Sequence, residues 1–120
     1  MKLVATDKAP QAIGPYSQGY ISGGLFFASG EIAINPATAE VLNGTIEEQT
    51  ELVCNNIGEL LKAAGTDFDH VVKTTCFLAD MGDFAAFNGV YAKFFTSKPV
   101  RSCVAVKTLP KNVLCEIEII

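Results

Sequence analysis

The sequence predicts an α+β fold of about six strands and two helices. Three observations support this class: short segments with period-2 alternation, two longer segments with helical periodicity, and turn residues at their junctions. The elements follow the order strand, strand, strand, helix, strand, helix, strand, strand. The chain shows no internal repeat, linker or low-complexity run, so we expect residues 1–120 to form one domain.

The first three strands are expected near the N-terminus. Lys2–Thr6 is a short strand, and a loop with two prolines follows at Pro10–Pro15. Two further strands, Gln18–Ser22 and Leu25–Ile32, flank Gly23-Gly24, a pair typical of a tight hairpin turn. Within Leu25–Ile32, Ser29 and Gly30 interrupt the apolar run. A glycine there marks either a simple irregularity or a close approach of a ligand to the backbone.

The first helix is expected to begin at Thr45, after a turn-rich loop at Asn35–Gly44. Thr45 and Glu48 have the spacing of a capping box, and Gly65 has the residue type that ends a helix. Apolar side chains at helical spacing predict that one side of this helix is buried. They are Val53, Ile57, Leu60, Leu61 and Ala64.

The next strand, Val71–Leu78, alternates and is rich in Val and Thr. Asp83 is the predicted cap of the second helix, whose aromatic residues recur at helical spacing and are expected in the core. Asn88 and Gly89 are poorer helix formers in its middle, so we expect them where a ligand or a subunit comes close. The aromatic residues are Phe84, Phe87, Tyr91 and Phe94.

The C-terminal segment Pro99–Ile120 is predicted to form two strands around a turn at Lys107–Asn112. Alternation places Arg101 with Cys103 and Ala105 on one face of the first strand, and Glu116 with Glu118 on one face of the second. A guanidinium near a carboxylate suits the floor of a pocket for a small anion. A cross-strand ion pair is the structural alternative.

Right-handed crossovers place both helices on one face of the sheet. The opposite face is then uncovered, and we expect it to include the Arg101 and Glu116 sides of the last two strands. Because 49% of the residues are hydrophobic, this face suggests an interface between copies of the chain.

Charge and hydropathy exclude several function classes. The net charge is -4 and the basic residues are scattered, so no stripe suits nucleic acid. No apolar run approaches the ~20 residues of a membrane span, and the N-terminus lacks the apolar segment of a secretory signal. We therefore expect a cytoplasmic protein.

The four cysteines lack metal-ligand spacing, and His70 is the only histidine. Reduced, structural thiols are the expectation for Cys54, Cys76 and Cys115, with two disulfides as the alternative. Cys103 shares a face with Arg101, and this cation could lower the pKa of its thiol. His70 is interpreted as an ordinary surface residue.

Several ordered motifs resemble the RidA/YjgF family of enamine/imine deaminases, and the resemblance covers nearly the whole chain. They are A-P-Q-A-I-G-P-Y-S-Q, A-S-G-E-I, V-K-T-T-C-F-L-A-D, and P-V-R-S-C-V followed by K-T-L-P-K and C-E-I-E. The chain departs from the family in two places. Cys115 replaces an aliphatic residue, and the link Phe95–Pro99 is short, which could reshape the mouth of a pocket.

The resemblance implies a chorismate-mutase-like fold with a mixed sheet, assembled as a homotrimer around an inner barrel with its pockets between subunits. It implies hydrolysis of 2-aminoacrylate, 2-aminocrotonate and their 2-imino acid tautomers, released by pyridoxal-phosphate enzymes, to 2-keto acids and ammonia. No metal or organic cofactor is implied. Arg101 would bind the carboxylate and Glu116 would activate water. The residues expected to bind substrate beside Arg101 are Tyr16, Ser29, Gly30, Asn88 and the main chain of Cys103.

Three other functions stay open from the sequence. The pocket could bind a 2-keto acid without turnover, although a carboxylate receptor gains nothing from Glu116. The family's older association with ribonuclease activity and translation inhibition suggests an RNA-directed role, against which the acidic charge counts. A purely structural interaction protein is the third alternative. Glu118 is expected either to support Glu116 or to form a structural ion pair.

Overall fold

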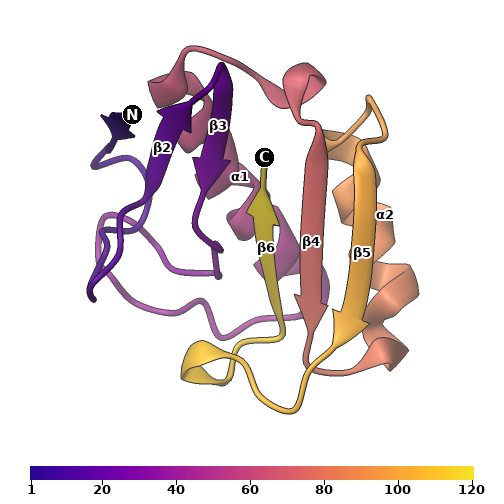
Figure 1. The fold of residues 1–120 in the computed structure, drawn as a ribbon. Coiled ribbons are helices and arrows are strands. Elements are labelled where there is room, and N and C mark those ends of the chain that lie inside the picture. Colours follow the sequence, from indigo (N-terminus) through magenta and orange to yellow (C-terminus); the bar gives the residue numbers. More distant parts are fainter.

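The computed structural model describes residues 1–120 and contains six strands and two helices in the predicted order (Figure 1). The helices are α1 (Ile46–Ala64) and α2 (Phe84–Phe94). Neither has the length and apolar character that crossing a membrane requires. The strands are β1 (Lys2–Val4), β2 (Gly19–Ser22), β3 (Leu25–Ala28), β4 (Lys73–Leu78), β5 (Val100–Ala105) and β6 (Cys115–Ile119).

The strands form two three-stranded sheets instead of the single six-stranded sheet that the sequence suggested. The first has the antiparallel order β1-β2-β3, and the second has the order β5-β4-β6, with β4 parallel to β5 and antiparallel to β6. One bridge joins them: Glu31 and Ile117 exchange backbone hydrogen bonds of 2.8 and 3.1 Å. β3 ends at Ala28, before Ser29 and Gly30, so only Glu31 continues the pairing.

The β2–β3 hairpin turns at the predicted glycine pair. Gly23 and Gly24 have φ of 60° and 77°, values that residues with a side chain seldom adopt. The pairing that follows places Tyr20 opposite Phe27 and Ile21 opposite Phe26. The turn therefore fixes which side chains of β3 face the core.

Both predicted ends of α1 are confirmed. Thr45 and Glu48 form the capping box, with hydrogen bonds of 3.2 and 3.0 Å, and Gly65 ends the helix in the left-handed conformation. Asp83 occupies the predicted N-cap position of α2, but its side chain makes no capping hydrogen bond. The side chain that does cap is Asp80, which accepts from the N–H of Gly82 in the short turn Met81–Asp83 before the helix.

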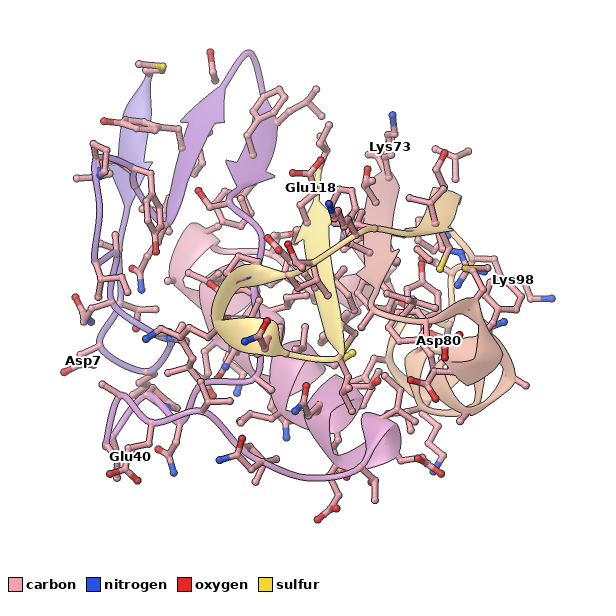
Figure 2. The ribbon with its side chains drawn as sticks, turned by 90° about the horizontal axis from the view of Figure 1, so that it is seen from below. Asp7, Glu40, Lys73, Asp80, Lys98 and Glu118 are labelled. Carbon is pink, nitrogen blue, oxygen red and sulfur yellow. The ribbon has the colours of Figure 1, made fainter.

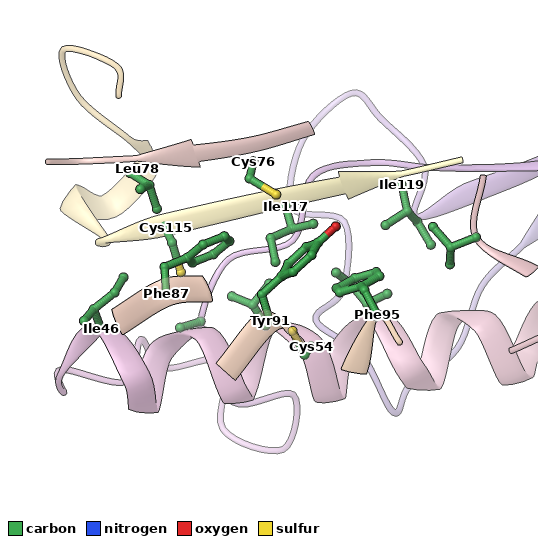
Figure 3. Close-up of a cluster of buried hydrophobic side chains, with 14 of the residues drawn as sticks. Ile46, Cys54, Cys76, Leu78, Phe87, Tyr91, Phe95, Cys115, Ile117 and Ile119 are labelled. Carbon is green, nitrogen blue, oxygen red and sulfur yellow. The ribbon is translucent and has the colours of Figure 1, made fainter. Parts of the chain in front are cut away.

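The core lies between the second sheet and the two helices. Alternate residues of β4 and β6 point toward the helices, and Figure 3 shows them above the aromatic side chains of α2. Both helices thus cover the same face, as predicted. The buried residues at this contact include Cys76, Leu78, Cys115, Ile117, Ile119, Phe87, Tyr91 and Phe95.

The strand faces turned away from the helices are uncovered and partly apolar. Five exposed apolar side chains lie on them: Leu3, Leu25, Phe27, Val100 and Val104. Unpartnered apolar side chains in this number favour association with another protein surface. The expectation of an uncovered face is therefore confirmed, although it spans two sheets.

Candidate active site

One cavity collects four of the residues that the sequence singled out. It has a volume of about 390 Å³ and is lined by Tyr16, Ser29, Gly30 and Glu116, with Glu31 beside them. Glu116 comes from the uncovered face of β6, Tyr16 from the N-terminal loop, and the others from the segment after β3. We call this space the acidic cavity.

Gly30 is required by the position of the Glu116 carboxylate. A Cβ added at Gly30 would overlap Oε2 of Glu116 and would lie 2.9 Å from its Cδ and 3.1 Å from its Cγ. Any side chain at this position would displace the carboxylate. The sequence left open a strand irregularity or the approach of a ligand at Gly30, and the group that the structure places against Gly30 is the side chain of Glu116.

Buried polar contacts hold the N-terminal loop beside the cavity. Gln18 is buried; its Oε1 accepts from the N–H of Thr6 at 2.8 Å and its Nε2 donates to the carbonyl of Pro10 at 2.7 Å. The hydroxyl of Ser29 donates to the carbonyl of Ser17 at 2.6 Å. These bonds fix the loop on both sides of Tyr16, which is 51% exposed and accessible to a ligand.

The cavity favours protonated carboxyl groups. Burial raises the pKa of Glu116 above its ordinary value, and the charge of Glu118 raises it further. Burial and then the charge of Glu116 raise the pKa of Glu31 to about 8. Neither carboxylate forms an ion pair with a basic side chain. The raised pKa makes the carboxylate of Glu116 a stronger base than an exposed glutamate, which suits a general base.

Arg101 lies in a second space, which we call the arginine groove. This groove has a volume of about 300 Å³ and is also lined by Asn88, Lys98 and Pro99. Nη1 of Arg101 donates to Oδ1 of Asn88 at 2.8 Å. No carboxylate pairs with the guanidinium, so its remaining donors are available to an anion.

Aromatic rings of α2 support the guanidinium of Arg101. Its central carbon lies 4.8 Å from the ring centroid of Tyr91 and 5.5 Å from that of Phe84, distances that suit cation–π attraction. The Tyr91 hydroxyl is in turn hydrogen-bonded to Oγ1 of Thr74 at 2.7 Å. A lysine would lose both the planar stacking and the fork.

Within one chain, Arg101 and Glu116 lie on opposite faces of the second sheet, which corrects the expectation that they share the uncovered face. Thr74 of β4 is opposite Arg101 on one side and Ile119 on the other, so the guanidinium is on the helix side. Glu116 is opposite Phe77, on the other face. The sequence suggested neighbouring strands, whereas β4 separates β5 from β6. In Figure 2, Lys98 lies beside α2, away from Glu118 on β6.

Cys103 contributes main-chain groups, and its thiol is not activated. Val100 and Val106 donate their N–H groups to β4, so alternation turns the amide and carbonyl of Cys103 toward the free edge of β5. Burial raises the pKa of the Cys103 thiol, and the opposing effect of Arg101 is smaller. Arg101 does act to lower this pKa, as predicted, but burial outweighs it, so the predicted net lowering of the thiol pKa is wrong. The expectation of reduced cysteines is confirmed, since all four are free.

Several residues at the two spaces escaped the sequence reasoning. Glu31 follows Gly30 directly, and an acidic residue in an apolar strand was the available signal. Phe84 and Tyr91 were assigned to the core, although their rings also support Arg101. Gly89 is exposed and lines neither space, so only its neighbour Asn88 is near a candidate site.

The other predicted features concern the surface and metals. His70 is exposed and its Nδ1 lies 2.7 Å from Oδ1 of Asp67, as expected of a surface histidine. The short link Phe95–Pro99 lines part of the arginine groove. No three His, Cys, Asp or Glu side chains gather where they could hold a metal ion.

Comparisons with known proteins place these features in a family context. Residues 6–120 match the family described as Endoribonuclease L-PSP. The chain is 55% identical to the "Putative regulator AldR" of Lactococcus lactis, over 100% of this chain and 96% of that protein. It is 44% identical to the 2-iminobutanoate/2-iminopropanoate deaminase of Bos taurus, over 99% of this chain and 88% of that protein. It superposes on E. coli TdcF with bound serine with a TM-score of 0.94, at 41% identity over 99% and 96%.

Proposed function

The chain belongs to the Endoribonuclease L-PSP family, which includes the RidA and YjgF proteins and the named imine deaminases, and we propose that it is itself such a deaminase. Its substrates would be 2-aminoacrylate, 2-aminocrotonate and their 2-imino acid tautomers, which pyridoxal-phosphate enzymes release. Its products would be 2-keto acids and ammonia.

The observation that carries the proposal is an incomplete site on each side of the second sheet. The arginine groove holds an unpaired guanidinium, and the acidic cavity holds a carboxylate of raised basicity. An imino acid needs both: a cation for its carboxylate and a base for the attacking water. Because Arg101 and Glu116 of the same chain lie on opposite faces of the second sheet, we propose that Arg101 of one copy completes the acidic cavity of another.

Two surfaces of the chain suit such an assembly. β5 is an edge strand with unpaired main-chain groups, and the faces turned away from the helices expose Leu25, Phe27 and Val104. We propose that three copies join through these surfaces, with the sheets facing an inner barrel and one site at each junction. The exposed apolar side chains would then be buried between subunits.

In the proposed reaction, Arg101 fixes the substrate carboxylate by two parallel charge-assisted hydrogen bonds. Asn88 occupies one donor of the guanidinium, and the rings of Tyr91 and Phe84 hold its plane. The fork is therefore oriented before the substrate arrives. Tyr16 and the main chain of Ser29, Gly30 and Cys103 would form the walls around the substrate.

Glu116 would hold a water molecule and accept its proton as the oxygen attacks the imine carbon. Burial raises the pKa of Glu116, which makes its carboxylate a stronger base. The imine carbon is electrophilic through its own C=N bond, so positioning and proton transfer are the tasks left to the protein.

A non-catalytic receptor for small carboxylates is the second candidate, because one relative carries the name of a regulator. It would use the same arginine groove but would have no need of Glu116. An RNA-directed role is disfavoured by the net charge of -4.

The test follows keto acid release when purified protein is added to the product stream of a threonine or serine dehydratase. The proposal expects a rate that rises with protein concentration and is lost in Glu116→Gln, while this variant still binds 2-keto acid. A rate independent of the protein, with intact keto acid binding, would favour the receptor.

A further inference from the structure

Two buried hydroxyl groups are hydrogen-bonded to each other next to Arg101. Oγ1 of Thr74 lies 2.7 Å from the hydroxyl of Tyr91; Thr74 is fully buried and Tyr91 is 8% exposed. Thr74 belongs to β4, the central strand of the second sheet, and Tyr91 belongs to α2 and lines the arginine groove. In Figure 3 the hydroxyl of Tyr91 points away from its helix toward the sheet. The bond therefore crosses the core and connects the sheet to the wall of the groove.

The strand register also places Thr74 beside Arg101. β4 and β5 are parallel, and Thr74 is the partner of Arg101 in this pair, so both side chains leave the sheet on the helix side. The ring centroid of Tyr91 lies 4.8 Å from the central carbon of the guanidinium. Three contacts thus form a closed triangle: strand pairing joins Thr74 to Arg101, a hydrogen bond joins Thr74 to Tyr91, and cation–π attraction joins Tyr91 to Arg101.

Stability alone does not require a polar pair at this place. Two buried hydroxyl groups that bond each other can be replaced together by apolar groups of the same shape at little cost, whereas removing one leaves the other unpaired. The neighbours of the pair in the core, Phe95 and Ile119, are apolar, and Phe95 stacks on the ring of Tyr91 at 4.4 Å. A hydrogen bond adds direction, which apolar contacts lack. The polar pair therefore suits a role in orienting the ring of Tyr91.

We propose that Thr74 is a positioning residue for recognition of the substrate carboxylate. Its hydroxyl holds the ring of Tyr91 at the inclination that fixes the guanidinium plane of Arg101, and this plane sets the direction of the two hydrogen bonds to the carboxylate. Thr74 itself does not touch the substrate, because it is fully buried in the core. The inference rests on the proposed deaminase function and extends its binding site from α2 to the central strand of the sheet.

The kinetic consequence follows from the place of the carboxylate in the reaction. Water attacks the imine carbon, and the substrate carboxylate keeps its charge throughout. Arg101 therefore binds the carboxylate about equally in the ground state and in the transition state. Loss of such uniform binding raises KM and leaves kcat unchanged. Loss of the Thr74 hydroxyl should accordingly weaken binding of the imino acid and of the 2-keto acid product, and should spare the chemical step.

The test compares Thr74→Val, Tyr91→Phe and the variant with both changes, and it measures KM, kcat, the Kd of a 2-keto acid and Tm. Each single change leaves one buried hydroxyl without its partner and should lower Tm, and the double change should recover most of that loss. KM and Kd should rise about three- to tenfold in all three variants, with kcat within about twofold of the wild type. A double variant that regains wild-type Tm, KM and Kd together would overturn the proposal, because the pair would then serve stability only.

Two further variants separate orientation from general destabilisation. Thr74→Ser retains the hydroxyl and should restore KM and Kd to near the wild-type values. Thr50→Val is the matched control: it removes another fully buried hydroxyl, which donates to the carbonyl of Ile46 within α1, and it should lower Tm without changing KM. If Thr74→Ser binds as weakly as Thr74→Val, or if Thr50→Val raises KM as much, the positioning role is wrong. Absence of imine hydrolysis in the wild type would instead refute the proposed function, and the keto acid affinities would still decide this inference.

Discussion

Replacing Gly30 by alanine tests whether the position of the Glu116 carboxylate matters for turnover. The added Cβ would lie 2.9 Å from Cδ of Glu116 and would overlap its Oε2. Because carbon atoms in contact stand about 3.5 to 4 Å apart, the carboxylate must move by about 0.6 to 1.1 Å. A displacement near 1 Å costs about 10²-fold in rate, or about 2.7 kcal/mol in activation free energy.

The fold should tolerate this change. The group displaced is the end of a flexible side chain, and Gly30 does not have the positive φ that strains other residues. We expect the free energy of unfolding to change by less than about 1 kcal/mol, measured by urea denaturation. Gly89→Ala is the matched control, since its added methyl meets nothing within 4 Å and should leave turnover unchanged.

The assay compares kcat for imine hydrolysis in the two alanine variants and the wild type. The prediction is a loss confined to Gly30→Ala, with a smaller change in keto acid affinity. If Gly30→Ala retained kcat within about threefold of the wild type, the position of Glu116 would not control the reaction.

The remaining predictions concern the groove, the cavity and the interface. Asn88→Ala removes one partner of Arg101 and should raise KM about tenfold with little change in unfolding free energy; unchanged KM would contradict the positioning role. Between the ordinary pKa of 4.5 and about 8, the folded state binds the Glu31 proton and the unfolded state does not, so stability should fall as pH rises, by at most about 5 kcal/mol. Thermal melts of Glu31→Gln should lack this fall. Phe27→Glu should dissociate the oligomer in sedimentation, and intact oligomers would place the interface elsewhere.

Local sequence signals predicted most of the fold because they act through neighbouring residues. The capping box at Thr45 and the turn at Gly23-Gly24 need only a few positions, and both are present in the structure. The placement of β4 between the last two strands depends on long-range pairing, which no local pattern encodes. Arg101 was therefore assigned to the correct strand and alternation but to the wrong face.

The candidate site was predictable where one segment supplied several of its residues. Ser29 and Gly30 interrupt a strand, and the structure places Glu116 against Gly30. Glu31 was missed because burial is a tertiary property, and an acidic residue reads as exposed until the packing around it is known. The two halves of the site could not be separated from sequence, because alternation gives faces only relative to a known neighbour.

Mixing two inactive variants tests most directly whether the site is built from two copies. Arg101→Ala and Glu116→Gln each lack one half, and co-refolding them in equal amounts should give mixed oligomers. If each site takes Arg101 from one copy and Glu116 from another, about one quarter of the sites in a random assembly regain both residues. We expect the mixture to recover about that fraction of wild-type activity. A mixture that assembles and stays as inactive as its two components would contradict it.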